Sequence, residues 1–134
     1  MLETNTKRKV PITDSMKDNF NERGVYCFKD KNTNKILYIG STSDSFKRRL
    51  MGHERFQTNW KLYRAIIDEV VLYDLLEVFE GGTVRELIER EATLIKEHRP
   101  LCNFQFKNDL TIEEDIANQI KVGKLKEKRL AATI

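Results

Sequence analysis

The sequence predicts one α+β domain, with a small antiparallel β-sheet of about three strands flanked by helices. Two strand-like segments joined by a turn lie at 24–40, and a third strand-like segment lies at 73–79. Segments with helical periodicity and N-cap residues surround them. A chain of 134 residues suits one domain and can bury a modest core.

The first elements are a short helix and a β-hairpin. Residues 12–23 favour the helix, and GVYCFKD at 24–30 and KILYIG at 35–40 alternate and are rich in strand formers. The intervening KNTN supplies turn residues. If the turn is centred near Asn32, Tyr26 pairs with Tyr38, and two phenols stand side by side on one face.

The remaining elements are predominantly helical. They are helices at 45–53 and 59–67, a strand at 73–79, a helix at 83–98, a short extended segment at 101–106 and a helix at 111–130 that Gly123 interrupts. Thr83 and Glu86 have capping-box spacing, as do Thr111 and Glu114. Pro100 ends the helix that starts at Thr83.

The composition is that of an intracellular, soluble protein. No stretch approaches eighteen apolar residues, and no apolar segment follows the basic cluster near the N-terminus, so we expect neither a membrane span nor a signal peptide. The isolated Cys27 and Cys102 are expected to be reduced thiols in the core or close to it. We expect three parts, an arm with a short helix at 1–22, a domain at 23–105 and a basic helical extension at 106–134.

The net charge of the chain is only +3, but basic residues gather in two clusters. Four cations face one acid in SFKRRLMGHER, and five face one acid in KVGKLKEKRL. Such clusters suit contacts with nucleic-acid phosphates, although they are equally typical of solvated helix faces and tails. The candidate nucleic-acid-binding residues are Lys47, Arg48, Arg55, Lys124, Lys126, Lys128 and Arg129.

Glu91 breaks an apolar pattern. It falls in the middle of a stripe formed by Val84, Leu87, Ile88 and Ile95, so its carboxylate is expected to face the core. A buried charge is costly unless it is paired or bound to a metal. Glu91 is therefore either half of a structural salt bridge or a functional carboxylate.

Four further residues add to this pattern. Helical spacing places Arg49 and His53 on the packed side of the helix at 45–53 and turns Arg48 to solvent. Taken singly, Arg49 and His53 could be edge residues, and Tyr26 and Tyr38 ordinary strand aromatics. Together with Glu91 they supply what phosphodiester hydrolysis needs, namely a phenol, a guanidinium and a metal-binding carboxylate.

The chain resembles the GIY-YIG nuclease family, spelled here GVY at 24–26 and YIG at 38–40. STSDSFKRRLMGH, EREATLI and RPLCN match the later family motifs in the same order. Many members have one residue fewer between YIG and the arginine, a spacing that would select Arg48. The helical face selects Arg49, so we place the extra residue in the STSDS loop.

The resemblance implies that Glu91 holds a single divalent ion, Mg²⁺ or Mn²⁺, and that Arg49 contacts the scissile phosphate. Tyr26 would be the general base or orient the water, although His53 and a metal-bound hydroxide stay open as the base. Tyr38 and His53 would complete the site. Supporting roles would fall to Asn103 as a brace and to Gly40, which would let a phosphate approach.

These residues predict a metal-dependent endonuclease that cuts one DNA strand per active site. We expect a compact phage, viral or mobile-element enzyme, a monomer or homodimer, in the cytoplasm, or in the nucleus of a eukaryote. The runner-up is a structure-specific or single-strand-specific nuclease that works with a protein partner. A non-catalytic nucleic-acid-binding adaptor of the same fold, or a small α/β protein whose cationic helix binds a protein, would also fit individual features.

Overall fold

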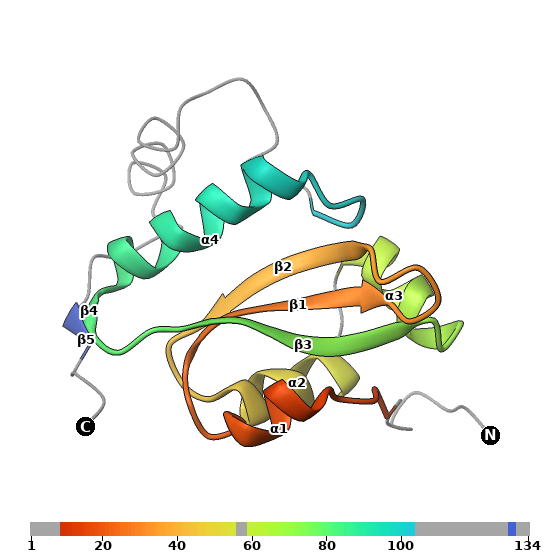
Figure 1. The fold of residues 1–134 in the computed structure, drawn as a ribbon, viewed down its shortest axis with the longest axis horizontal. Helices are drawn as coiled ribbons and strands as arrows, with labels where there is room; N and C mark the ends of the chain where they lie inside the picture. The colour runs from red at the N-terminus through yellow and green to blue at the C-terminus, as the bar shows by residue number, and fades with distance from the viewer. Residues whose placement is uncertain (1–8, 56–58, 104–128, 131–134) are drawn as a thin grey trace.

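A three-stranded antiparallel sheet forms the centre of the fold. The computed structural model describes residues 9–55, 59–103 and 129–130. The strands are β1 (Gly24–Asp30), β2 (Ile36–Thr42) and β3 (Val71–Val78), in the order β2-β1-β3. β1 is therefore the central strand and β2 an edge strand (Figure 1). This sheet with its flanking helices confirms the predicted fold class.

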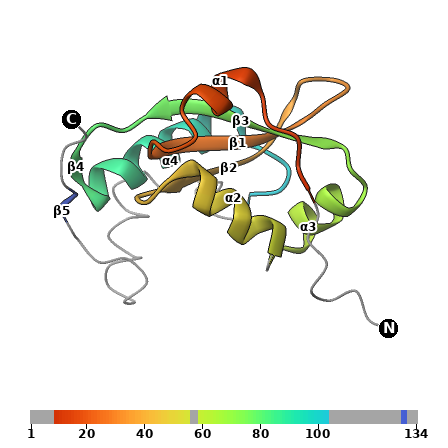
Figure 2. The same ribbon diagram turned by 90° about the horizontal axis from the view of Figure 1, so that it is seen from below.

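Helices cover both faces of the sheet. They are α1 (Asp14–Asp18), α2 (Phe46–Arg55), α3 (Trp60–Ile67) and α4 (Val84–His98). α4 lies along one face, whereas α1 and α2 lie on the other (Figures 1 and 2). The first helix is shorter than the predicted 12–23. It begins at Asp14 because Ile12 bridges to Tyr73 of β3 and Thr13 is the N-cap, and it ends at Asp18 with Asn19 as the C-cap.

The two faces of the sheet bury separate clusters of side chains, as the alternation along β1 requires. Tyr26 and Phe28 pack on the face covered by α1 and α2, with Phe46 and Leu50 of α2. Val25 and Cys27 pack on the opposite face, against α4. Both cysteines are buried and free, as predicted.

Local capping signals set the helix boundaries. Thr83 and Glu86 form both hydrogen bonds of the predicted capping box at the start of α4. At its C-terminus Arg99 adopts a left-handed conformation with φ of 45°, and Pro100 follows. Asn59 caps α3 by accepting hydrogen bonds from the backbone of Lys61 and Leu62.

The predicted hairpin register is wrong. Tyr26 pairs with Gly40 and Phe28 with Tyr38. The carboxylate of Asp30 accepts hydrogen bonds from the backbone N–H groups of the turn, and this moves the centre of the turn. An irregularity between Phe28 and Lys29 then inserts one extra residue into β2.

The C-terminal prediction can be compared with the structure at one point. Arg129–Leu130 form β5, which pairs with β4 (Gly82–Thr83), so these two residues are extended and not helical. The rest of the predicted helix at 111–130, including its capping box and Gly123, lies outside the described residues.

None of the described helices combines the length and hydropathy that crossing a membrane requires. The proposed boundaries at 22/23 and 105/106 stay predictions.

Candidate active site

Tyr26 is the central side chain of the candidate site. It is fully buried, and its ring lies directly over Gly40 of the paired strand. A Cβ atom at position 40 would approach Cζ of Tyr26 to 2.5 Å and its hydroxyl still more closely. Gly40 therefore provides the space that the Tyr26 phenol occupies. This close contact is a sufficient structural reason for the glycine, and its predicted role in letting a phosphate approach stays a prediction.

Two side chains of α2 bind the Tyr26 hydroxyl. Nε of Arg49 donates a hydrogen bond to it over 3.0 Å, and Nε2 of His53 lies 2.7 Å from it. Because the Arg49 contact uses the oxygen as an acceptor, the phenolic hydrogen is available to donate to Nε2 of His53. The three groups form one hydrogen-bonded chain across the gap between β1 and α2.

Burial keeps the phenol and the imidazole of this chain neutral. It raises the pKa of Tyr26 well above its ordinary value, and the nearby Tyr38 adds to the effect, while Arg49 opposes it. Burial and then the charge of Arg49 lower the pKa of His53 to about 3. A neutral imidazole with an unprotonated Nε2 is the form that accepts the Tyr26 proton.

The arginines at 48 and 49 face different surroundings. Arg48 is exposed and forms an ion pair with Asp44 one helical turn earlier, at 3.0 Å. Arg49 is also exposed, but its Nε reaches inward to the hydroxyl of Tyr26. This is the arrangement that the helical spacing predicts. It leaves Arg49 at the boundary between the buried chain and solvent.

Tyr38 lies beside Tyr26 although the two do not pair across the strands. Their ring centres are 6.5 Å apart. Since Tyr26 pairs with Gly40, Tyr38 is its diagonal neighbour on the same face. Burial raises the pKa of Tyr38, the charge of Glu91 raises it further, and Arg49 opposes both. Tyr38 is thus within electrostatic reach of both the arginine and the glutamate.

Glu91 approaches from the other face of the sheet. It is 8% exposed on α4, and its carboxylate accepts a hydrogen bond from the hydroxyl of Ser41 in β2. Burial raises its pKa to about 7, and Ser41 and Arg49 act in the opposite direction. Within residues 9–55 and 59–103 no cation forms an ion pair with Glu91. The salt-bridge alternative for Glu91 is therefore not observed in the described part of the chain.

Asn103 holds the edge strand in place. Its side-chain amide accepts a hydrogen bond from the N–H of Ile39 and donates one to the C=O of Ile39, each over 2.9 Å. The adjacent Cys102 N–H donates to the C=O of Leu37 over 2.8 Å. Residues 102 and 103 thereby pair with the open edge of β2, immediately before Gly40 and Ser41.

β2 therefore joins the two halves of the candidate site. The Tyr26, Arg49 and His53 chain lies on the α2 face, and Ser41 presents Glu91 on the α4 face. Alternation along the strand produces this division, because Gly40 and Ser41 point to opposite faces. Ser41 was not among the sequence-predicted residues, although its place in the alternation puts it on the Glu91 side.

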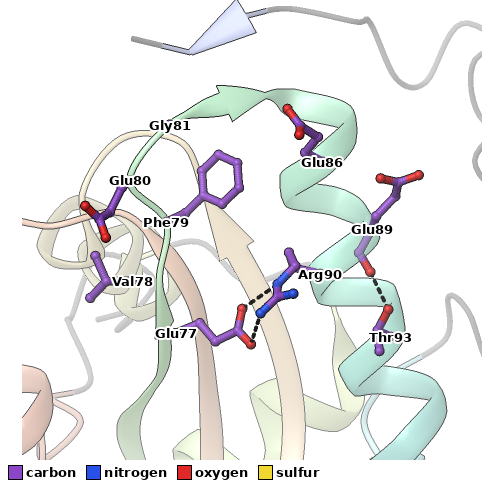
Figure 3. A pocket seen from close by; sticks show the side chains of 9 residues that line it. All are labelled: Glu77, Val78, Phe79, Glu80, Gly81, Glu86, Glu89, Arg90 and Thr93. Carbon is purple, nitrogen blue, oxygen red and sulfur yellow. Dashed lines mark hydrogen bonds and ion pairs between the residues drawn. The ribbon is translucent and has the colours of Figure 1, made fainter. Parts of the chain in front are cut away.

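A surface hollow lies away from the candidate site. It is a groove of about 560 Å³ between the end of β3 and α4, lined by four glutamates among others, with Arg90 binding Glu77 through two contacts of 2.8 Å (Figure 3). None of its lining residues belongs to the candidate site. In the part of the chain that the structure describes, no three His, Cys, Asp or Glu side chains are grouped so that they could hold a metal ion.

The predicted nucleic-acid-binding residues fall into two sets. Lys47, Arg48 and Arg55 are exposed on α2. The predicted contacts at Lys124, Lys126 and Lys128 lie outside the described residues, and Arg129 is in β5. The placement of the α2 set agrees with a surface role, and the role itself stays a prediction.

The combination of a buried phenol, an arginine, a histidine and a buried carboxylate is that of a site for phosphodiester chemistry. Residues 22–106 match the GIY-YIG catalytic domain. The chain therefore belongs to the GIY-YIG family of nucleases. This confirms the predicted family and, with it, the predicted enzyme class of endonuclease.

Several relatives have related sequences. The chain is 31% identical over 93 residues to UvrABC system protein C of Geotalea daltonii, covering 66% of this chain and 14% of that protein. It is 37% identical over 90 residues to the protein of that name from Prochlorococcus marinus, covering 66% and 13%. This chain thus spans a small part of the length of these curated relatives.

A solved structure is also similar. It is the GIY-YIG N-terminal endonuclease domain of UvrC from Thermotoga maritima, bound to magnesium as its catalytic divalent cation. The two chains share 28% sequence identity, and the match has a TM-score of 0.45, covering 69% of this chain and 99% of that chain.

Proposed function

We propose that this chain hydrolyses phosphodiester bonds of DNA in a reaction that needs one divalent ion, Mg²⁺ or Mn²⁺. The observation that carries the proposal is the division of the site by β2. A hydrogen-bonded Tyr26, Arg49 and His53 lie on one face, and a buried Glu91 without a cationic partner in the described residues lies on the other. This arrangement has the parts for in-line attack of water on a phosphate.

Glu91 fits the role of metal ligand. Among the described residues the buried carboxylate is bound by one serine hydroxyl, so it keeps oxygen lone pairs for a cation. Mg²⁺ needs only one or two protein carboxylates because it retains several waters. When bound, the ion would supply Lewis-acid stabilisation of the phosphate and of the leaving oxygen. Ser41 would hold the carboxylate in a fixed orientation.

Tyr26 and His53 would remove the proton from the attacking water. The buried phenol does not ionise readily, so a free phenolate is unfavourable as the base. The contact of 2.7 Å offers another route. As Tyr26 Oη takes a proton from water, its own hydrogen passes to Nε2 of His53. The water oxygen loses its O–H bond as it bonds to phosphorus, and Tyr26 Oη exchanges one O–H bond for another. Nε2 of His53 gains the proton and becomes an imidazolium, so no free phenolate forms.

Arg49 would bind the phosphate and stabilise its developing charge. Its Nε contacts Tyr26, and its Nη groups carry four further N–H donors at the partly exposed end of the side chain. Tyr26 has no exposed surface in the free protein. A shift of Arg49 towards the phosphate would open access for water to the phenol. Preorganised donors of this kind contribute several kcal/mol to transition-state stabilisation.

Each site would cut one strand, so a double-strand break needs a homodimer, a second binding event or a partner. The names of the relatives favour the partner-dependent alternative, because each is a component of a UvrABC system.

Lys47, Arg48 and Arg55 on α2 would contact DNA phosphates. The basic residues near the C-terminus would add sequence-independent contacts, and we propose a cytoplasmic location. A phage or mobile-element origin stays a prediction.

The test is cleavage of supercoiled, linear and single-stranded DNA, each with Mg²⁺ or EDTA. Glu91→Ala and Arg49→Ala should abolish the Mg²⁺-dependent cleavage of the wild type. Glu89→Ala is the matched control for Glu91, since Glu89 is a half-exposed neighbour on α4 to which the proposal gives no role, and this variant should retain most activity. Near-normal cutting by Glu91→Ala would overturn the proposal, and binding without cutting by the wild type would favour the adaptor alternative.

A further inference from the structure

α3 presents aromatic side chains to solvent that the proposed reaction does not use. Trp60 is 67% exposed and Tyr63 is 50% exposed. Their spacing of three residues makes them neighbours on the helix surface. The opposite side of α3 buries Leu62 and Ile66 in the core. The outer surface of this helix is therefore aromatic where a solvated helix would be polar.

The position of α3 relative to the candidate site is fixed. The side-chain amide of Asn59, at the start of α3, donates a hydrogen bond to the C=O of Cys102 over 2.6 Å. Cys102 and Asn103 in turn pair with the edge of β2 beside Gly40. The same two-residue segment thus anchors both α3 and the strand that carries the site.

Positive charge accompanies these aromatic residues. α2 and α3 together carry six lysine and arginine residues and one acid, Glu54. The carboxylate of Glu54 accepts a hydrogen bond from the backbone of Val10. α2 and α3 follow one another along the same side of the sheet (Figure 2). A hollow of about 300 Å³ on α2 is lined by Arg48, Met51, Gly52 and Arg55.

The acidic groove between β3 and α4 has the opposite character (Figure 3). Anionic ligands are therefore favoured on the α2 and α3 side of the molecule. Within α3, Lys61 Nζ lies 5.7 Å from the centre of the Trp60 ring, so a cation and an aromatic face are presented together. Aromatic rings that stack on bases, beside cations that bind phosphates, are typical of surfaces for single-stranded nucleic acid.

We propose that Trp60 and Tyr63 stack on unpaired bases of the nucleic-acid substrate, while Lys61 and Arg64 contact its phosphates. The inference rests on the proposed function and narrows its substrate class to DNA with a single-stranded or unstacked stretch near the scissile bond. A duplex hides its base faces within the stack, so it would gain only the phosphate contacts. A second copy of the chain or a protein partner is the competing occupant.

The single tryptophan of the chain makes the test direct, because all tryptophan fluorescence comes from Trp60. The full chain is titrated in EDTA with an unlabelled single-stranded oligothymidylate and with a duplex of equal length. We expect saturable quenching by the single strand and much weaker quenching by the duplex. Trp60→Leu should weaken single-strand binding about tenfold in fluorescence anisotropy with a labelled oligonucleotide, the loss expected for one stacked base.

Three further variants separate stacking from charge. Tyr63→Leu should weaken binding of the single strand more than that of the duplex. Lys61→Glu with Arg64→Glu should weaken both and lower the slope of log affinity against log salt by at least about 1.4 for the single strand. Val78→Ala is the matched control, an exposed apolar residue in β3 beside the acidic groove, and should change neither.

Equal affinity of wild type and Trp60→Leu for the single strand, or no quenching, would overturn the stacking proposal. If the chain self-associates, Trp60→Leu abolishes this association and the oligonucleotide leaves the Trp60 fluorescence unchanged, the surface would instead bind a second copy of the chain. If the single strand quenches Trp60 but the wild type cuts no DNA, the nuclease function alone is rejected. If the wild type cuts DNA but the single strand does not quench Trp60, the stacking surface alone is rejected. Glu91→Ala should still show the quenching.

Discussion

The hydroxyl of Tyr26 in β1 lies 2.7 Å from Nε2 of His53 in α2. Arg49 donates to the same hydroxyl from the preceding turn of α2, so three consecutive groups share one proton network. Burial disfavours both the phenolate and the imidazolium. A relay through the pair avoids a free phenolate, but it places the proton on His53 as an imidazolium, the form that burial disfavours, so that state would be short-lived.

His53 should leave no titration in the pH profile between 5 and 9. Because burial and Arg49 lower its pKa to about 3, the imidazole is already neutral throughout this range. The rate of cleavage at saturating Mg²⁺ should show no acidic limb near pH 6.5 that belongs to His53. His53→Ala should reduce kcat roughly 10² to 10⁴-fold, the range for general acid–base groups. A wild-type rate that falls below pH 6.5, with the fall absent in His53→Ala, would contradict the relay of neutral groups.

Gly40→Ala should displace the Tyr26 phenol. The added Cβ would overlap the ring, whose Cζ lies 2.5 Å from the ideal Cβ position. We expect a loss of about 1 to 3 kcal/mol in the free energy of unfolding, the usual cost of overpacking, and a larger loss of activity than Tyr26→Phe produces. Urea unfolding and cleavage rates measure the two effects. Gly52→Ala is the control, since a Cβ there meets no atom within 4 Å.

Glu91 should make the metal-free protein less stable as pH rises. Burial raises its pKa from 4.5 to about 7, so the folded state binds the proton more tightly than the unfolded chain. This contribution is complete below pH 4.5 and is lost as pH rises through 7, a total of about 3 kcal/mol.

Urea unfolding in EDTA, compared with Glu91→Gln over pH 4 to 8, isolates the effect from that of His53. His53 acts in the opposite sense, because its lowered pKa costs stability as pH falls from 6.5 towards 3. A constant difference in unfolding free energy between wild type and Glu91→Gln across this range would refute the assignment to Glu91.

Asn103→Ala should weaken the edge of β2. It leaves the N–H and C=O of Ile39 without their side-chain partners, at a cost of about 2 to 4 kcal/mol in unfolding free energy. Hydrogen exchange at the Ile39 amide should accelerate relative to the amides of β1. Unchanged protection of that amide would show that Asn103 does not brace the strand.

Periodicity was sufficient to place Arg49, His53 and Glu91 on inward-facing sides of their helices. Each argument needed only the 3.6-residue repeat and the neighbouring apolar positions. The capping box at Thr83 was likewise readable, because its two hydrogen bonds depend on residues only three positions apart. The fold class followed from the same local patterns.

The hairpin register and the partner of Glu91 needed information that is not local. The pairing of Tyr26 with Gly40 depends on the turn at Asp30 and on the extra residue in β2, each of which shifts the register. Ser41 becomes a partner of Glu91 only when α4 packs on β2. The ionisation of Tyr26 depends on its complete burial, which no residue pattern in β1 specifies.

The most direct test of the central claim is to count bound ions and measure cleavage on the same samples. Mn²⁺ binding followed by electron paramagnetic resonance should give one tight site per chain in the wild type and in Glu89→Gln. Glu91→Gln should lose both that site and the cleavage of supercoiled DNA while remaining folded. Retention of the tight Mn²⁺ site in folded Glu91→Gln would contradict the assignment of Glu91 as the metal ligand.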